Sequence, residues 1–264
     1  VWPKYRQIAA VWVLTPFVGG GIAFGIASVL PRPGAPERCC IPMLAGIVGA
    51  VLVNVEFGFL APGSAPGAVR AVVQRALGVD GPISAVAITG GAAVAIAAVV
   101  WWDVDRDEHA GLRHVLLALG SLVAFSAGGS QVGLAVGPLL PLLDDVGVAS
   151  SFAVLVGGGL GMLAGSWTGA PRMIKSLAQD YSSLGPRRSI SALVPSFLIA
   201  QLAVFLGIPV SFNEIVVSAI IGSGAAVGGW DAVDATKIAV TVGAWAGSFV
   251  LSFALAYAAG SVLL

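Results

Sequence analysis

One stretch of the chain, Phe205 to Gly224, places polar groups inside a long apolar run, at Pro209, Ser211, Asn213 and Glu214. Proline lacks a backbone N–H and disfavours helix in the residue before it. Polar groups at membrane depth are tolerated only where they face protein or a water-filled cavity. We therefore expect a discontinuous helix whose interruption carries these groups. In secondary transporters, interruptions of this kind commonly form the binding site.

A second polar segment, Ser126 to Gln131 (SAGGSQ), lies inside the apolar run Val115 to Leu143. Glycine permits positive φ angles and close approach of the backbone to a ligand. Serine and glutamine side chains each donate hydrogen bonds. We expect a second helix break or re-entrant turn here. An ordinary packing kink, with small residues at a helix crossing, is the alternative.

The two segments together have the chemistry of an anion site coupled to a cation. A dianion is bound by backbone N–H groups at the start of a half-helix, helped by the helix dipole, and by hydroxyl and amide donors. The candidate substrate-binding residues are Gly128, Gly129, Ser130, Gln131, Ser211 and Asn213. Sodium needs oxygens, and the candidate coupling-ion residues are Glu214, Ser211 and Ser130. A buried carboxyl group can instead take up a proton, so the residues leave both ions open.

Composition places this chemistry in a membrane. The chain has 264 residues, of which 58% are hydrophobic and 10% charged, and its mean hydropathy is +0.97. Soluble domains carry about 25% charged residues. We predict a multi-pass protein of the cell membrane, an all-α transmembrane helix bundle. The zero net charge gives no argument for nucleic acid. Neither a metal spacing nor a nucleophile motif occurs, so we expect no enzyme, no cofactor and no metal other than sodium.

A membrane helix needs about 20 mostly apolar residues. The expected spans are Ile8 to Leu30, Ile41 to Leu60, Pro82 to Trp102, Val115 to Leu143, Ser151 to Ala164, Leu193 to Gly228 with its interruption, and Lys237 to Leu264. Between Ala61 and Gly81 we expect a short interfacial helix, and the charged segment Asp103 to His114 is expected in water. The excess positive charge between Gly165 and Ser191 indicates the cytoplasmic side.

The two ends of the chain share a layout. The pattern around Lys4 and Trp12 returns around Lys237 and Trp245 at the same spacing. This indicates two repeated halves, of which the first is incomplete. We expect residues 1–30 to be the last helix of the first half-repeat, residues 31–114 to form connecting helices and loops, and residues 115–264 to be a second half-repeat with both interruptions.

Four segments, in order, resemble the inorganic phosphate transporter (PiT, PHO4-type) family of symporters. They are AFSAGGSQVGLAVGPL (Ala124 to Leu139), GSWTGAPRMIKSLAQDYSSLGP (Gly165 to Pro186), LGIPVSFNEIVVSAIIGSG (Leu206 to Gly224), and the tryptophan helix at Trp245 with its counterpart at Trp12. The region Ile41 to Trp102 adds only hydropathy. The resemblance implies inverted-repeat halves, two broken helices that meet, symport of phosphate with sodium or protons by alternating access, and a homodimer.

The chain departs from the family pattern at the site. The family's AFSHGANDVANAVGPL has an Asn-Asp pair where this chain has Ser130 and Gln131. Its LGIPVSTTHAIVGAIVGVG has Thr-Thr-His where this chain has Phe212, Asn213 and Glu214. One acid is thus lost and another gained. A permease for sulfate or another oxyanion and a transport-inactive scaffold or regulator therefore remain alternatives. Asn213 and Glu214 could also occupy a helix terminus near the headgroups, where a carboxylate favours the dipole.

Overall fold

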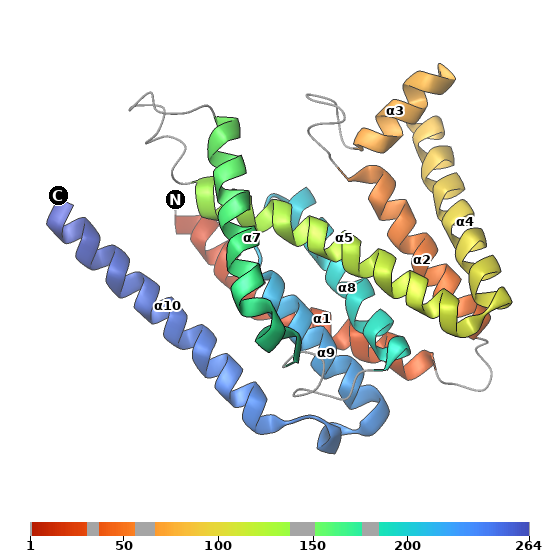
Figure 1. Ribbon diagram of the computed structural model, residues 1–264. Coiled ribbons are helices and arrows are strands. Elements are labelled where there is room, and N and C mark those ends of the chain that lie inside the picture. Colours follow the sequence, from red (N-terminus) through yellow and green to blue (C-terminus); the bar gives the residue numbers. More distant parts are fainter. Residues whose placement is uncertain (1, 31–36, 56–66, 138–150, 176–184, 264) are drawn as a thin grey trace.

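The computed structural model describes residues 2–30, 37–55, 67–137, 151–175 and 185–263, and every regular element in these ranges is helical (Figure 1). The elements are α1 (Trp2–Val29), α2 (Glu37–Asn54), α3 (Ala68–Leu77), α4 (Pro82–Arg106), α5 (Glu108–Val136), α7 (Ser151–Lys175), α8 (Pro186–Phe205), α9 (Phe212–Gly228), the short 3₁₀ turn η3 (Trp230–Ala232) and α10 (Ala235–Leu263). The predicted all-α class is confirmed.

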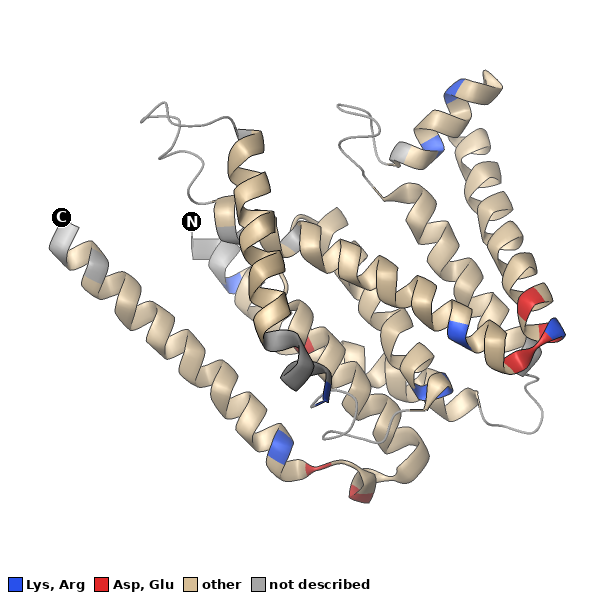
Figure 2. Cartoon of the chain, viewed as in Figure 1, with Lys and Arg blue, Asp and Glu red and all other residues tan. Residues whose placement is uncertain are grey.

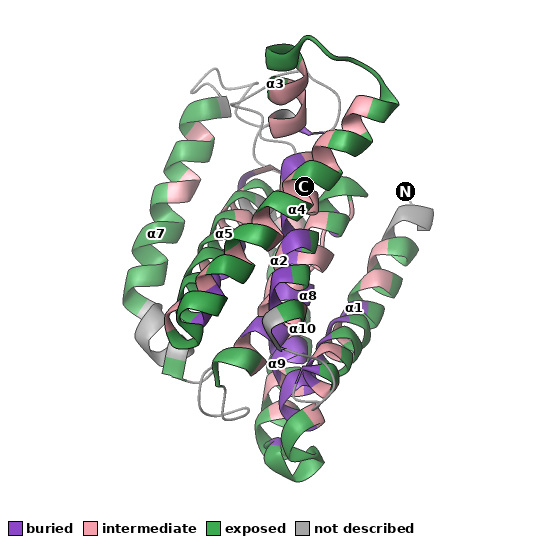
Figure 3. Cartoon of the chain, turned by 90° about the vertical axis from the view of Figure 1, so that its right-hand side faces the viewer, coloured by how far each residue is buried: buried purple, intermediate pink, exposed green. Residues whose placement is uncertain are grey.

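Within the described residues, five helices are long and apolar enough to cross a membrane: α1, α4, α5, α8 and α10. The apolar stretches in α2, α7 and α9 are shorter. Large apolar side chains on α4, α7 and α10 are exposed. Figure 3 shows this for α7, which is mostly green. An apolar surface of this kind suits contact with lipid. The fold is therefore that of a multi-pass membrane protein, as predicted.

The buried centre of the molecule is formed by α8 with α5, α1 and α2. Phe197, Val194 and Ile190 of α8 are at most 1% exposed, and they pack with Leu112 and Val115 of α5 in one cluster. The purple residues of α8 in Figure 3 belong to this cluster. The purple residues of α9 belong to a neighbouring cluster with Ala23 of α1. Serines within it bond back to their own helices, as Ser196 does to Ala192, so no water is needed to satisfy them.

Helices α1 and α9 cross at glycines. A Cβ atom added at Gly222 of α9 would overlap the backbone of Gly20 in α1. Small residues let membrane helices approach this closely, and the packing they allow drives association in lipid. The crossing fixes α9, and with it the start of the helix that carries Asn213 and Glu214, against α1.

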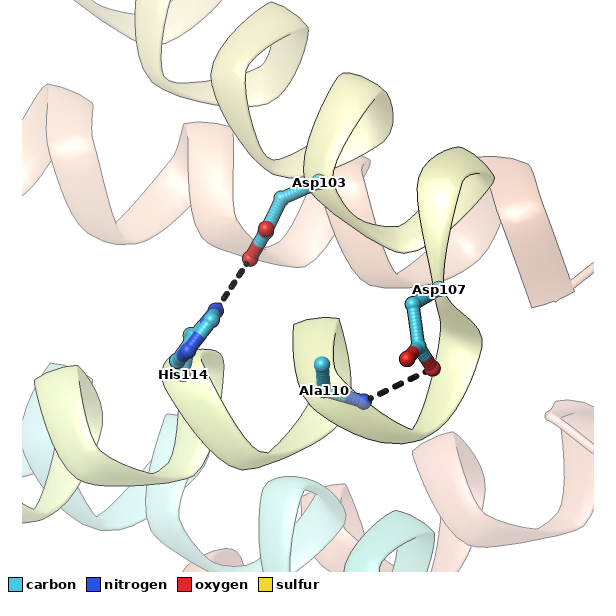
Figure 4. A network of polar contacts seen from close by, with 4 residues as sticks. All are labelled: Asp103, Asp107, Ala110 and His114. Atoms are coloured by element: carbon cyan, nitrogen blue, oxygen red, sulfur yellow. Dashed lines mark hydrogen bonds and ion pairs between the residues drawn. The ribbon is translucent and has the colours of Figure 1, made fainter.

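Charged residues gather at one end of the bundle, where α4 ends and α5 and α8 begin (Figure 2). Asp103 of α4 contacts His114 of α5 at 2.8 Å, and Asp107 caps α5 by accepting from the Ala110 N–H at 3.1 Å (Figure 4). The segment expected in water is therefore largely helical: it comprises the last turn of α4, a capping residue and the first turns of α5.

The predicted break at Ser126 to Gln131 is wrong. Helix α5 runs without interruption from Glu108 to Val136. Glycine costs about 1 kcal/mol in a helix relative to alanine. The adjacent glycines Gly128 and Gly129 are not enough to end this helix of 29 residues. A packing kink at a close crossing is not observed either, because Cβ atoms added at Gly128 and Gly129 would meet nothing within 4 Å.

The other predicted helices in the described residues are present, but several of their ends differ from the prediction. The short helix expected between Ala61 and Gly81 is α3. Helix α7 continues to Lys175, beyond the predicted Ala164, and α8 begins at Pro186 rather than Leu193. The predicted ends of the second and fourth spans, Leu60 and Leu143, lie outside the described residues.

Candidate anion-binding site at the α8–α9 break

The predicted interruption between residues 205 and 214 is present, and a glycine shapes it. Helix α8 ends at Phe205, and Gly207 follows with a φ of +63°. The Gly207 N–H donates to the Val204 carbonyl at 3.0 Å, and the Ile208 N–H donates to the Ala203 carbonyl at 2.9 Å. This pair of bonds is the Schellman motif that commonly closes a helix. The chain then leaves the helical path until Ser211.

The interruption is held against α1. The Trp12 indole N–H donates a hydrogen bond of 2.8 Å to the Pro209 carbonyl. Trp12 lies ten residues into α1, about 15 Å along that helix at 1.5 Å per residue. The break is therefore alongside the interior of a membrane-spanning helix and not at its end.

Helix α9 starts with a side-chain cap. Ser211 is the N-cap, and its hydroxyl oxygen accepts from the Glu214 N–H at 3.5 Å. Asn213 and Glu214 are half-buried in the first turn. Both residues thus occupy a helix terminus, as the alternative expected, and this terminus lies beside Trp12 of α1. A position near the headgroups stays a prediction. Free N–H groups and the positive end of the dipole are directed toward the break.

A cavity of about 340 Å³ lies between this break and α5. Its walls are Gly129 and Gly133 from α5, Ala200, Ala203 and Val204 from α8, and the break itself from Gly207 to Val210, with Phe212. The structure therefore brings one of the predicted α5 glycines, Gly129, to the α8–α9 break. The missing Cβ of Gly129 leaves open space. We call this space the break cavity.

Among the described side chains, none of the remaining predicted residues lines the break cavity. Ser211, Asn213 and Glu214 lie at the start of α9, adjacent in sequence to the lining residues Val210 and Phe212. Gly128 and Gln131 are half-buried in α5 beside Gly129. For Ser130 the structure describes the backbone, which is helical, and its side chain lies outside the described atoms.

Gln201 was not among the predicted site residues. Its side-chain amide in α8 donates to the Ser126 hydroxyl of α5 at 2.5 Å, so the two helices that flank the break cavity are joined by a polar contact. The signal was available, because a single amide in the apolar segment LIAQLAVF is costly in a membrane unless it has a partner.

Gln201 also borders a second cavity, of about 390 Å³, between α8 and α2. Asn54 of α2 lines its other side. The Asn54 amide donates to Thr89 of α4 at 3.0 Å, and its oxygen accepts from the Arg70 guanidinium of α3 at 2.6 Å. This network ties α2, α3 and α4 together around one polar residue.

The fold and site define a class: an all-helical, multi-pass membrane protein with an interrupted helix beside a cavity, the arrangement found in secondary transporters. Comparison with known proteins gives the family. The chain matches the phosphate transporter family, PHO4, over residues 1–256, and it belongs to that family. The match extends through the region between residues 41 and 102, where only hydropathy was informative.

Two relatives and one solved structure illustrate the likeness. The sodium-dependent phosphate transporter 1 of Homo sapiens is 30% identical over 132 residues, which cover 47% of this chain and 19% of that protein. A probable low-affinity inorganic phosphate transporter of Mycobacterium tuberculosis (strain CDC 1551 / Oshkosh) is 23% identical over 217 residues, covering 78% of this chain and 49% of that protein. The chain thus spans about half or less of the length of these relatives.

A solved structure described as "The sodium-dependent phosphate transporter" shares the fold, with a TM-score of 0.63 and 20% identity over 86% of this chain and 58% of that one. The predicted family and the membrane location are confirmed. Because the family is one of transporters, the prediction that the chain is not an enzyme is also confirmed.

Proposed function

We propose that this protein transports inorganic phosphate across the cell membrane by ion-coupled symport. The observation that supports it best is the break cavity: in a member of the phosphate transporter family, the interruption before α9 lines a space of about 340 Å³, and its lining includes Val210 and Phe212, which flank the capping residue Ser211. Ligand sites are usually preformed cavities of about 300–1,000 Å³, and a helix N-terminus favours an anion.

In this proposal the anion is bound from two sides. The first turn of α9 supplies N–H groups, with the Ser211 hydroxyl and the Asn213 amide as side-chain donors. The α5 side supplies Gly128, Gly129, Ser130 and Gln131. Gly129 leaves the open space that a polyatomic anion needs, and Gln201 fixes α5 against α8 through Ser126.

The coupling ion is proposed to bind at Glu214, with Ser211 and Ser130. Glu214 is half-buried in the first turn of α9, and the Ser211 hydroxyl is its neighbour through the cap. A carboxylate, a hydroxyl and carbonyls outside the helical ladder form an oxygen set suited to sodium. The same carboxylate can alternatively carry a proton, so the ion has to be determined by experiment.

Transport would occur by alternating access. The proposed assembly is a homodimer. In this proposal the α1–α9 crossing at Gly20 and Gly222 moves as one body, because a contact this close does not allow sliding.

Uptake of labelled phosphate into proteoliposomes tests the proposal. We expect accumulation driven by a sodium or a proton gradient, and competition by excess unlabelled phosphate. Glu214→Gln should remove the dependence on the gradient, because an amide neither binds the proton nor neutralises the cation. The matched control is Asp231→Asn, which changes an exposed acid beyond the end of α9.

Sulfate provides the second comparison. Uptake of labelled sulfate that exceeds phosphate uptake would assign a different oxyanion to the same site. The absence of both activities in a folded protein would identify a transport-inactive member of the family, and gradient-driven phosphate uptake by Glu214→Gln equal to that of the parent would contradict the proposed role of Glu214.

A further inference from the structure

A third cavity, separate from the break cavity and from the space beside Gln201, opens at the charged end of the bundle. It has a volume of about 420 Å³ and lies where α5 and α8 begin and α1 and α9 end. Its polar lining residues are Glu108, His109, Arg187, Arg188 and Ser191. We call it the mouth cavity.

The lining of the mouth cavity holds more basic than acidic side chains. Two guanidinium groups, Arg187 and Arg188, face one carboxylate, Glu108. Arg187 and Glu108 form an ion pair of 2.7 Å, in which both side chains are nearly half exposed. Guanidinium groups have a planar set of donors that matches a phosphate group. An anion entering this space would compete with Glu108 for Arg187.

The floor of the mouth cavity is rigid and mostly apolar. Three apolar side chains of the floor are at most 4% exposed: Ala27 in α1, Leu30 directly after α1, and Leu112 in α5. Ser191 of α8 is 1% exposed. The Ser191 hydroxyl donates to the Arg187 carbonyl at 3.0 Å, so it holds the first turn of α8 in place. The basic side chains are therefore presented from a fixed surface with low polarity beneath them, where charge pairing is stronger than in bulk water.

The mouth cavity is separate from the break cavity. Ser191 and Ala200, the nearest residues of α8 that line one cavity each, are nine residues apart, about 14 Å along the helix. Between them Val194 and Phe197 are 1% exposed in the core. The packed core therefore closes the route between the two spaces in this conformation.

We propose that the mouth cavity is a second site for a phosphate group, bound by Arg187 and Arg188 with His109 at its edge. The ligand is either inorganic phosphate or the phosphodiester of an anionic lipid, because both carry the group that the guanidinium donors recognise and the apolar floor accepts a lipid's glycerol backbone. This site does not depend on the proposed transport activity.

Hydrogen exchange of the purified full chain tests this site directly. In one arm, inorganic phosphate is titrated onto the protein in a neutral detergent. In the other, nanodiscs of phosphatidylglycerol are compared with nanodiscs of phosphatidylcholine, without phosphate. We expect ligand binding to slow hydrogen exchange in the first turns of α5 and α8. If the ligand is inorganic phosphate, exchange slows in the phosphate titration. If the ligand is a lipid, exchange is slower in phosphatidylglycerol than in phosphatidylcholine nanodiscs.

Four substitutions distinguish the site from general charge effects. Arg187→Gln and Arg188→Gln should each weaken binding about tenfold, the typical effect of losing a charged hydrogen bond. Glu108→Gln should strengthen it, because the competing carboxylate is removed. Arg113→Gln is the matched control and should change nothing, since Arg113 is exposed on α5 and does not line the cavity.

Asn213→Ala separates this proposal from the proposed function. It alters the break and should leave protection at the mouth unchanged. Protection in neither arm, or protection that persists in both arginine variants, would overturn the proposal. If the arginine variants do not fold, an unchanged affinity in folded Glu108→Gln overturns it as well.

Discussion

The indole N–H of Trp12 donates to the carbonyl of Pro209 at 2.8 Å, across 197 positions of sequence. Helix α8 closes at Gly207, and Pro209 cannot donate a backbone N–H within the break, where lipid cannot satisfy the carbonyls. A tryptophan from the first helix supplies one of the required donors. The bond therefore sets the position of the α8–α9 break relative to α1.

Trp12→Phe keeps the ring but removes the donor. We expect a loss of about 0.5–1.5 kcal/mol in the free energy of unfolding, the usual effect of one hydrogen bond, measured by denaturant unfolding in detergent. Trp167→Phe is the control, because Trp167 is 79% exposed on α7. Equal stability of the two variants would mean that the Trp12 bond does not hold the break.

Gly222→Ala tests the α1–α9 crossing. The added Cβ overlaps the Gly20 backbone, which cannot move aside as a flexible side chain would. We expect a destabilisation of about 1–3 kcal/mol, typical of overpacking, together with a lower thermal midpoint. Gly243→Ala on α10 should be neutral or slightly stabilising, since its Cβ meets nothing within 4 Å. A Gly222→Ala protein as stable as the parent would contradict the close crossing.

Gly129→Ala tests the break cavity without disturbing the helix. The substitution raises the helix propensity of α5 by up to about 1 kcal/mol, so the protein should be at least as stable as the parent. Its methyl group enters space that the proposed anion occupies, so phosphate uptake should fall severalfold through a higher KM. Gly120→Ala is the matched control: it is the same substitution on the same helix, its Cβ meets nothing within 4 Å, and it does not line the cavity. The same KM in both variants would count against a ligand at Gly129.

The contact between Gln201 and Ser126 calls for a double-mutant cycle. Gln201→Met preserves side-chain volume, and Ser126→Ala removes the acceptor. We expect the two effects on unfolding free energy to be non-additive by about 0.5–1.5 kcal/mol. Strict additivity would show that the 2.5 Å contact contributes nothing to the pairing of α5 with α8.

Local chemistry made part of this fold predictable. The α8–α9 break follows from Pro209 and from the polar residues clustered behind it, and a capping serine followed three residues later by a glutamate is a recognised helix start. Helices α1, α4 and α10 follow from apolar runs of membrane length. These features depend on residues that lie close together in the sequence.

The features that were missed depend on distant neighbours. Gly128 and Gly129 remain helical although glycine pairs often end helices, and only the surroundings of α5 decide this. The role of Gln201 depends on Ser126, which lies 75 positions earlier in the sequence and in another helix. The break cavity could not be predicted, because its volume is set by the spacing of α5 and α8.

The most direct test of a phosphate site in the break cavity is protection of a cysteine placed on its wall. In a background with Cys39→Ser and Cys40→Ser, Val210→Cys puts a thiol on the wall of that cavity. Val79→Cys puts one on an exposed turn as the matched control. We predict that inorganic phosphate slows modification of the residue-210 thiol by a small methanethiosulfonate reagent and leaves the residue-79 thiol unaffected. Equal rates at residue 210 with and without saturating phosphate, in protein that still accumulates phosphate, would contradict this location.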